Sequence, residues 1–174
     1  ITFFEINPTV VTYARRYFTY LRDAKATVKV ILGDARIQME RQLKESYRGH
    51  YDVIVIDAFS GDSIPMHLLT MEALDLYGKL LKPGGVLAFH TSNMHLDIHF
   101  LVHNMATRLN LPAYLLESKS DLPREIYGST WVMVTTNREL PRIPNVAQLI
   151  KKWPASHHKT IWTDNYGSIL QLLK

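Results

Sequence analysis

Short apolar runs rich in β-branched residues alternate along the chain with longer segments in which apolar residues recur at helical spacing. This alternation is typical of strands joined by crossover helices, and it predicts a doubly wound α/β fold with a mostly parallel sheet. Strands are expected at 2–6, 28–32, 51–56 and 86–89, and helices at 8–21, 35–47, 66–81 and 96–109. An antiparallel pair of strands at 113–116 and 131–135 and short helices at 146–153 and 168–173 are expected to complete the chain.

Length and composition narrow the class of protein. A chain of 174 residues with 47% hydrophobic residues predicts a single globular domain spanning residues 1–174. A net charge of +4 is too small an excess to indicate nucleic-acid binding. The absence of cysteine excludes disulfides and thiol nucleophiles, and we expect a cytoplasmic protein. Because an apolar strand is predicted from the second residue, we expect the chain to be part of a longer protein.

Acidic residues follow the predicted strands. Glu5 ends the first strand, Asp34 follows the second, and Asp57 follows the third, with Asp62 five residues later. A fourth polar group, residues 90–93, follows the fourth strand. Ligands of open parallel sheets bind beyond the carboxyl ends of the strands, so we expect a binding site at this edge.

The segment 51–65 carries the most chemical information, because an apolar strand runs directly into a loop with two carboxylates. A primary amine is protonated at neutral pH, so an enzyme that uses an amine as a nucleophile needs a base to take its proton. Asp57 and Asp62 could divide the tasks of base and cation anchor. A structural alternative is that Asp62 or Ser63 caps the following helix.

Four segments together carry a family resemblance: FFEINPTVVTYARRYF, GDAR, YDVIVIDAFSGDSIPMHLLT and LKPGGVLAFHTSN. The chain resembles the spermidine synthase family of aminopropyltransferases over about residues 2–137, and especially its bacterial spermidine synthase-like branch. The resemblance implies the fold of class I S-adenosylmethionine-dependent methyltransferases, and we expect this chain to be truncated before the first strand of that fold. It also implies transfer of an aminopropyl group from decarboxylated S-adenosylmethionine to a polyamine such as putrescine, without a metal.

The resemblance also implies roles for individual residues. Glu5 would bind the ribose hydroxyls of the nucleoside, and Asp34 with the amide of Ala35 would recognise the adenine edge. Asp57 would deprotonate the attacking amine. These roles make the predicted carboxyl edge both the cofactor site and the catalytic site.

The acceptor side of the site is implied by the same resemblance. Asp62 would anchor the acceptor, and Tyr127 would pack along its methylene chain. Typical family members place the two acids three residues apart, whereas Asp57 and Asp62 are five apart, which is compatible with an acceptor other than putrescine.

Two other classes of function remain open on the sequence. One is a methyltransferase that uses S-adenosylmethionine itself, and the other is a non-catalytic domain that binds polyamines or nucleosides. Some members of the resembled branch carry a membrane transporter-like domain, so a membrane domain in the parent protein and a homodimer are both left open as partners.

Three histidines, His95, His99 and His103, recur at every fourth position. On one continuous helix they would share a face and could bind zinc or nickel. No accompanying carboxylate motif such as HExxH is present, so we expect a polar stripe and no metal site.

Overall fold

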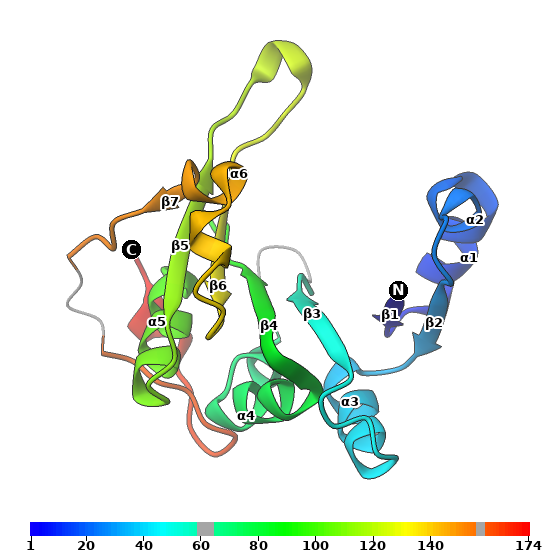
Figure 1. The fold of residues 1–174 in the computed structure, drawn as a ribbon, viewed down its shortest axis with the longest axis horizontal. Coiled ribbons are helices and arrows are strands. Elements are labelled where there is room, and N and C mark those ends of the chain that lie inside the picture. The colour runs from blue at the N-terminus through cyan, green and yellow to red at the C-terminus, as the bar shows by residue number, and fades with distance from the viewer. Residues whose placement is uncertain (59–64, 156–158) are drawn as a thin grey trace. The chain divides into compact units, whose positions relative to one another are not determined.

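The computed structural model describes residues 1–58, 65–155 and 159–174. Strands and helices alternate along the chain as the sequence predicts (Figure 1). The chain divides into two compact units, Ile1–Tyr47 and Arg48–Lys174, and each unit contains its own sheet.

The first unit is a parallel strand–helix–strand element followed by a helix. Its elements are β1 (Thr2–Glu5), α1 (Pro8–Tyr17), α2 (Tyr20–Asp23), β2 (Lys29–Leu32) and α3 (Ala35–Lys44). The side chain of Asn7 begins α1 by accepting a hydrogen bond from the amide of Thr9, and Pro8 occupies the first turn. Phe18 then adopts an extended conformation, which divides the predicted helix 8–21 into α1 and α2.

The second unit contains a five-stranded sheet in the order β3-β4-β6-β5-β7. Its elements are β3 (Tyr51–Ile56), η1 (Met66–Leu68), α4 (Met71–Leu80), β4 (Leu81–His90), α5 (Ile98–Arg108), β5 (Ala113–Ser118), η2 (Leu122–Arg124), β6 (Ser129–Val134), η3 (Leu140–Arg142), α6 (Pro144–Ala147), β7 (Ile150–Lys151) and η4 (Ile169–Leu172). β3 and β4 are parallel, whereas β6 is antiparallel to both β4 and β5. The predicted antiparallel pair is therefore confirmed.

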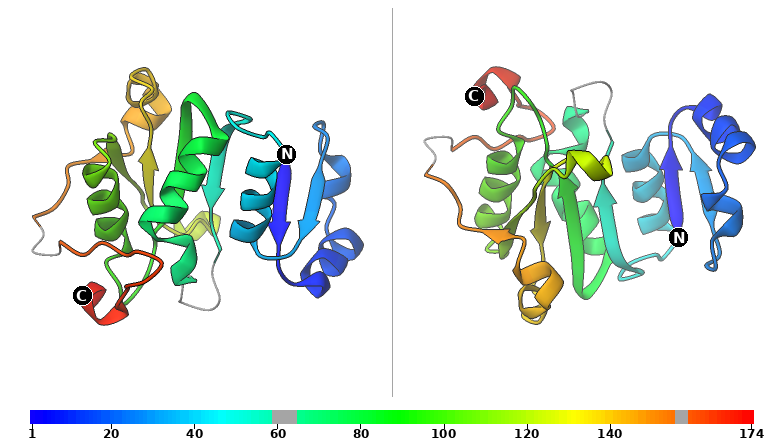
Figure 2. Two further views of the ribbon diagram at one scale, coloured as in Figure 1. Left: turned by 90° about the horizontal axis from the view of Figure 1, so that it is seen from below. Right: turned by 90° about the horizontal axis from the view of Figure 1, so that it is seen from above.

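The core of this unit lies between one face of the sheet and the helices α4 and α5, which lie along it (Figure 2). Side chains alternate between the two faces of a strand. Buried positions that share the helix-covered face by register are Ile54, Ile56, Leu87, Phe89, Leu115, Val132 and Val134. Tyr77 of α4, which is fully buried, contacts Phe89 at a ring-centroid distance of 6.5 Å. On the opposite face of β3, Val53 and Val55 are about half exposed, at 52% and 54%.

The run Pro83–Gly85 lies inside β4, although the sequence predicts it as the stop signal that separates a helix from the strand 86–89. α4 ends earlier, at Leu80, and β4 begins at the next residue. The parallel ladder pairs Tyr51 with Leu81 and resumes at Val53 and Val86, so extra residues of β4 bulge out between these pairs. Gly84 adopts a φ of 74°, a conformation that glycine accommodates without strain.

The helix predicted at 146–153 is wrong for most of its length. α6 ends at Ala147, and Ile150–Lys151 instead pair with β5 as the short strand β7. The indole of Trp153 donates a hydrogen bond of 3.2 Å to the carbonyl of Ala113, beside the start of β5. The apolar positions of this segment therefore extend the sheet, and the sheet context overrides their helical spacing.

The C-terminal segment 162–166 packs against the start of α4. The hydroxyl of Thr70 accepts a hydrogen bond from the amide of Ala73, which begins the helix, and it donates one of 2.8 Å to Oδ1 of Asp164. The amide of Asp164 donates to Glu72 in the first turn of α4. Trp162 is buried beside them, with only 2% of its surface exposed. Segments far apart in the sequence are thus joined at one helix terminus.

Among the described residues, no helix is both long and apolar enough to cross a lipid bilayer. The cytoplasmic location stays a prediction.

Candidate active site

Asp57 and His90 meet at the carboxyl edge of the parallel β3–β4 pair. Ile56 and Phe89 are partners in the ladder, so the next residue of each strand lies side by side with the other. Oδ1 of Asp57 and Nδ1 of His90 are 2.8 Å apart. By alternation both side chains belong to the sheet face that α4 and α5 do not cover. The sheet therefore brings an acid and an imidazole into direct contact.

His90 is held from three directions. Its Nε2 lies 2.8 Å from Oγ of Ser92, and that oxygen accepts a hydrogen bond of 2.8 Å from the amide of Thr130. Trp131, the ladder partner of His90 on β6, stacks on the imidazole with ring centroids 4.7 Å apart and planes 22° apart. The imidazole therefore has contacts along both edges and on one of its faces.

The two members of the pair differ in exposure, since the side chain of His90 is 24% exposed and that of Asp57 is 52% exposed. The imidazole is thus fixed by its surroundings, while the carboxylate remains accessible to a ligand. An accessible carboxylate with a hydrogen-bonded neighbour can bind a cationic group or take a proton from one.

The predicted nucleoside residues lie together at the carboxyl edge of the first unit's sheet. Glu5 ends β1, and one of its oxygens accepts a hydrogen bond of 2.8 Å from the amide of Asn7. Asp34 is the N-cap of α3, with Oδ1 accepting from the amide of Ile37 at 3.0 Å. Ala35 is the first residue of that helix. Both acids thus have local structural roles, and their nucleoside-binding roles stay predictions.

Of the two predicted acceptor contacts, Tyr127 lies within the described residues and Asp62 does not. Asp62 and the neighbouring Ser63 lie outside the described residues, so neither the acceptor role nor the capping alternative is tested. Tyr127 lies in the loop between η2 and β6, with 78% of its surface exposed. The phenol is therefore available to a ligand.

The three histidines do not form one helical stripe. α5 begins at Ile98, so His95 lies before the helix and only His99 and His103 share it. Burial lowers the pKa of His99, and burial also lowers that of His103, whose ring contacts the ring of Trp153 at 4.0 Å. The described part of the chain contains no group of three potential metal ligands from His, Cys, Asp and Glu.

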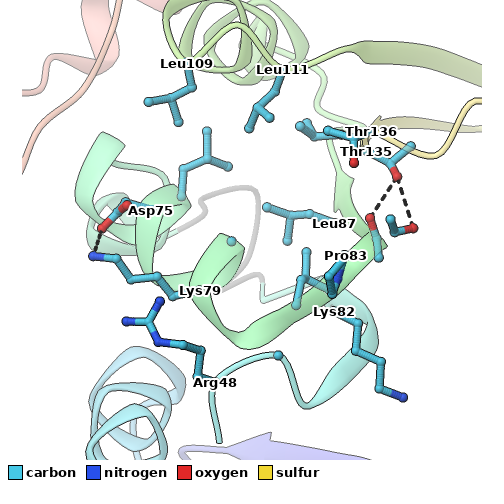
Figure 3. Close-up of a pocket in the computed structure, with 17 residues that line it drawn as sticks. Arg48, Asp75, Lys79, Lys82, Pro83, Leu87, Leu109, Leu111, Thr135 and Thr136 are labelled. Carbon is cyan, nitrogen blue, oxygen red and sulfur yellow. Dashed lines mark hydrogen bonds and ion pairs between the residues drawn. The ribbon is translucent and has the colours of Figure 1, made fainter.

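A cavity of about 590 Å³ lies at the other end of β4, away from Asp57 and His90. Leu87, Leu109 and Leu111 point into it, and Arg48, Lys79 and Lys82 lie at its rim (Figure 3). Lys79 pairs with Asp75. Lys82 binds both carboxylate oxygens of Asp52 at 2.8 Å. Because two of these three cations already have carboxylate partners, the rim gives no clear preference for an anionic ligand.

Sequence reasoning placed residues 90–93 at the correct edge but assigned no role to His90 or Ser92, and it missed Trp131. The sequence signal for His90 is its place directly after a predicted strand, as Asp57 comes directly after the strand before it, so both are expected at the same edge of the sheet. Trp131 has no comparable signal, since its place depends on β6 pairing with β4.

Comparison with known proteins adds the following relationships. The family model described as the spermine/spermidine synthase domain matches residues 1–139. A polyamine aminopropyltransferase of Vibrio vulnificus (strain CMCP6) is 41% identical over 87 residues, which are 50% of this chain and 28% of that protein. An N-terminal histidine N-methyltransferase of Emericella nidulans is 36% identical over 89 residues, covering 51% of this chain and 15% of that protein. The chain therefore spans less than a third of either relative.

Solved structures share the fold at low sequence identity. The spermidine synthase of Thermotoga maritima aligns with a TM-score of 0.56 and 16% identity, covering 94% of this chain and 54% of that one. A spermidine synthase in complex with the transition-state analogue AdoDATO aligns with a TM-score of 0.57 and 16% identity, covering 94% of this chain and 55% of that one. The O-methyltransferase of Bacillus cereus in complex with SAH aligns with a TM-score of 0.53 and 20% identity, covering 78% of this chain and 62% of that one. Together these alignments confirm the predicted α/β fold of the methyltransferase-like kind.

Proposed function

The chain belongs to the spermine/spermidine synthase family, and from this premise we propose that it carries the catalytic base of an aminopropyltransferase. The observation that carries the proposal is the accessible carboxylate of Asp57, in contact with His90 at the carboxyl edge of β3 and β4. The proposed donor is decarboxylated S-adenosylmethionine, and the proposed acceptor is a polyamine such as putrescine. The name of the Vibrio vulnificus relative and the AdoDATO complex of the solved neighbour support this choice.

The proposed reaction joins the acceptor nitrogen to the aminopropyl carbon beside the sulfonium. A C–N bond forms, the C–S bond breaks, and the sulfur leaves as a neutral thioether with the electron pair of the broken bond. The attacking amine must lose one proton, and Asp57 takes it. The sulfonium charge makes the thioether a good leaving group, so the protein's main tasks are to orient the amine and to receive its proton.

The donor set of the first unit fits an adenosyl group. A carboxylate offers about four acceptor sites, and the amide of Asn7 uses one on Glu5, which leaves capacity for a ribose diol. Asp34 and the amide of Ala35, at the start of α3, are the proposed adenine contacts. Asp62 and Tyr127 are the proposed contacts of the acceptor's cationic and methylene parts.

A methyltransferase is the second candidate, because the Emericella nidulans relative is named as one. Both reactions move a carbon group from a sulfonium to a nitrogen nucleophile. The donor preference separates them, since a methyltransferase requires S-adenosylmethionine with its carboxylate.

The test is product formation by the natural full-length protein, supplied with decarboxylated S-adenosylmethionine and a panel of diamines and polyamines. Asp57→Asn should lower the rate of transfer by about 10²- to 10⁴-fold, the usual contribution of a general base. Asp52→Asn is the matched control, because Asp52 lies at the other end of β3, where the hydrogen bond from Lys82 lowers its pKa. Equal rates for Asp57→Asn and Asp52→Asn would contradict the role of Asp57, and transfer only from S-adenosylmethionine would favour the methyltransferase.

A further inference from the structure

We propose that His90 is the positioning residue of Asp57 and that Ser92 orients the imidazole for this task. The inference rests on the proposed function, because it assigns Asp57 the role of base. It goes beyond that function by naming two residues, one at the end of β4 and one after it, on which the base depends.

The hydrogen-bond donors and acceptors around the imidazole fix the direction of the contact. An amide can only donate, so Oγ of Ser92 accepts from Thr130 and its own proton is available for Nε2 of His90. A neutral imidazole that accepts at Nε2 carries its proton on Nδ1 and donates it to Asp57. A bare Nδ1 would instead place two acceptors 2.8 Å apart, which is unfavourable.

The network also accommodates a charged imidazole. In that state both ring nitrogens donate, and the hydroxyl of Ser92 accepts from Nε2 as well as from the amide of Thr130. The hydrogen bond from Nδ1 to Asp57 is therefore present in both protonation states of His90. The contact at Asp57 does not depend on the charge of the ring, which suits a residue whose task is orientation.

The consequence for Asp57 is that Nδ1 of His90 occupies one acceptor site of Oδ1 and fixes the direction of the carboxylate. Oδ2 is then the less crowded oxygen for the amine's proton. The stacked indole of Trp131 restricts tilting of the imidazole, which keeps Nδ1 directed at Asp57.

A purely structural role of His90 would give the same contacts as a positioning role. The test therefore compares variants that distinguish positioning from structural support. His90→Phe keeps a ring to stack on Trp131 and removes the donor to Asp57. His90→Asn loses the ring but retains an N–H donor near the position of Nδ1. Ser92→Ala removes the group that selects the Nδ1–H form of the neutral imidazole.

Positioning predicts that His90→Phe lowers kcat for transfer by about 10- to 100-fold, as misplacement of a reacting group by about 1 Å does, while KM for the acceptor changes less than about threefold. His90→Asn should recover most of the lost kcat although it packs less well. Ser92→Ala should lower kcat by a smaller factor. A structural role instead predicts that activity follows the melting temperature, with His90→Asn the worse of the two His90 variants.

These assays are run beside the wild type and Asp57→Asn. Failure of the proposed function can then be distinguished from failure of the role proposed for His90. Transfer that is lost in Asp57→Asn but unchanged in His90→Phe overturns the role of His90 and leaves the proposed function intact. No transfer by folded wild type to any amine overturns both. Nitrogen NMR of the imidazole gives a readout without turnover: the Nδ1–H form, lost in Ser92→Ala, supports the inference, and an Nε2–H form of neutral His90 overturns it.

Discussion

The hydroxyl of Thr70 joins the start of α4 to the C-terminal segment, and its removal should have a calculable cost. Thr70→Val keeps the shape of the side chain but deletes both the cap to Ala73 and the bond to Asp164. Loss of an N-cap costs about 1 kcal/mol. A hydrogen bond to a charged acceptor contributes about 1.5–3 kcal/mol, and the partial exposure of Asp164 favours the lower end. We therefore expect Thr70→Val to lower the free energy of unfolding by about 2.5 kcal/mol.

The control is Thr70→Ser, which keeps the hydroxyl and loses one buried methyl group, at a cost of about 0.8 kcal/mol. Denaturant unfolding followed by tryptophan fluorescence is a suitable assay, because all 3 tryptophans of the chain lie in the unit Arg48–Lys174. A double-mutant cycle with Asp164→Ala isolates the direct bond and should give a coupling energy of about 1.5 kcal/mol. Equal losses for the valine and serine variants, or a coupling near zero, would refute the reasoning.

Two further predictions concern pH and glycine. Burial lowers the pKa of His99 and of His103 from the usual 6.5, so the unfolded chain binds more protons below that pH and stability should fall from pH 7 to pH 5. Replacing both with Gln should flatten the pH dependence of the melting temperature, and replacing exposed His95 should not. In α4, a Cβ at Gly78 would have no neighbouring atom within 4 Å, so Gly78→Ala should raise the free energy of unfolding by about 0.5–1 kcal/mol. Gly128→Ala, whose Cβ would lie 2.9 Å from the carbonyl of Ser118, should lower the melting temperature.

The alternation of strands and helices could be predicted from the sequence, because burial of a strand and of a helix face leaves different periodicities. The interruption at Phe18 and the strand β7 could not, since each depends on contacts that the local pattern does not contain. The run Pro83–Gly85 shows the same limit, because these residues end helices and form bulges equally well.

Part of the candidate site could be predicted from the sequence, and the remaining part depends on how the strands pair. Asp57 follows directly from the rule that ligands bind beyond the carboxyl ends of parallel strands. Its contact with His90 requires the exact register of β3 and β4, in which Ile56 pairs with Phe89 beyond the bulge. The stack on Trp131 requires the pairing of β6 with β4, a long-range choice that one sequence does not reveal.

The bulge at Pro83–Gly85 also has a consequence for how this protein can change in evolution. It lies upstream of the regular ladder Val86–Phe89, so the chain can gain or lose residues at the bulge while the ladder beyond it keeps its register. A one-residue change inside that ladder would instead turn His90 to the helix-covered face, away from Asp57. Natural variation in chain length is therefore expected at Pro83–Gly85, and a fixed length from Val86 to His90.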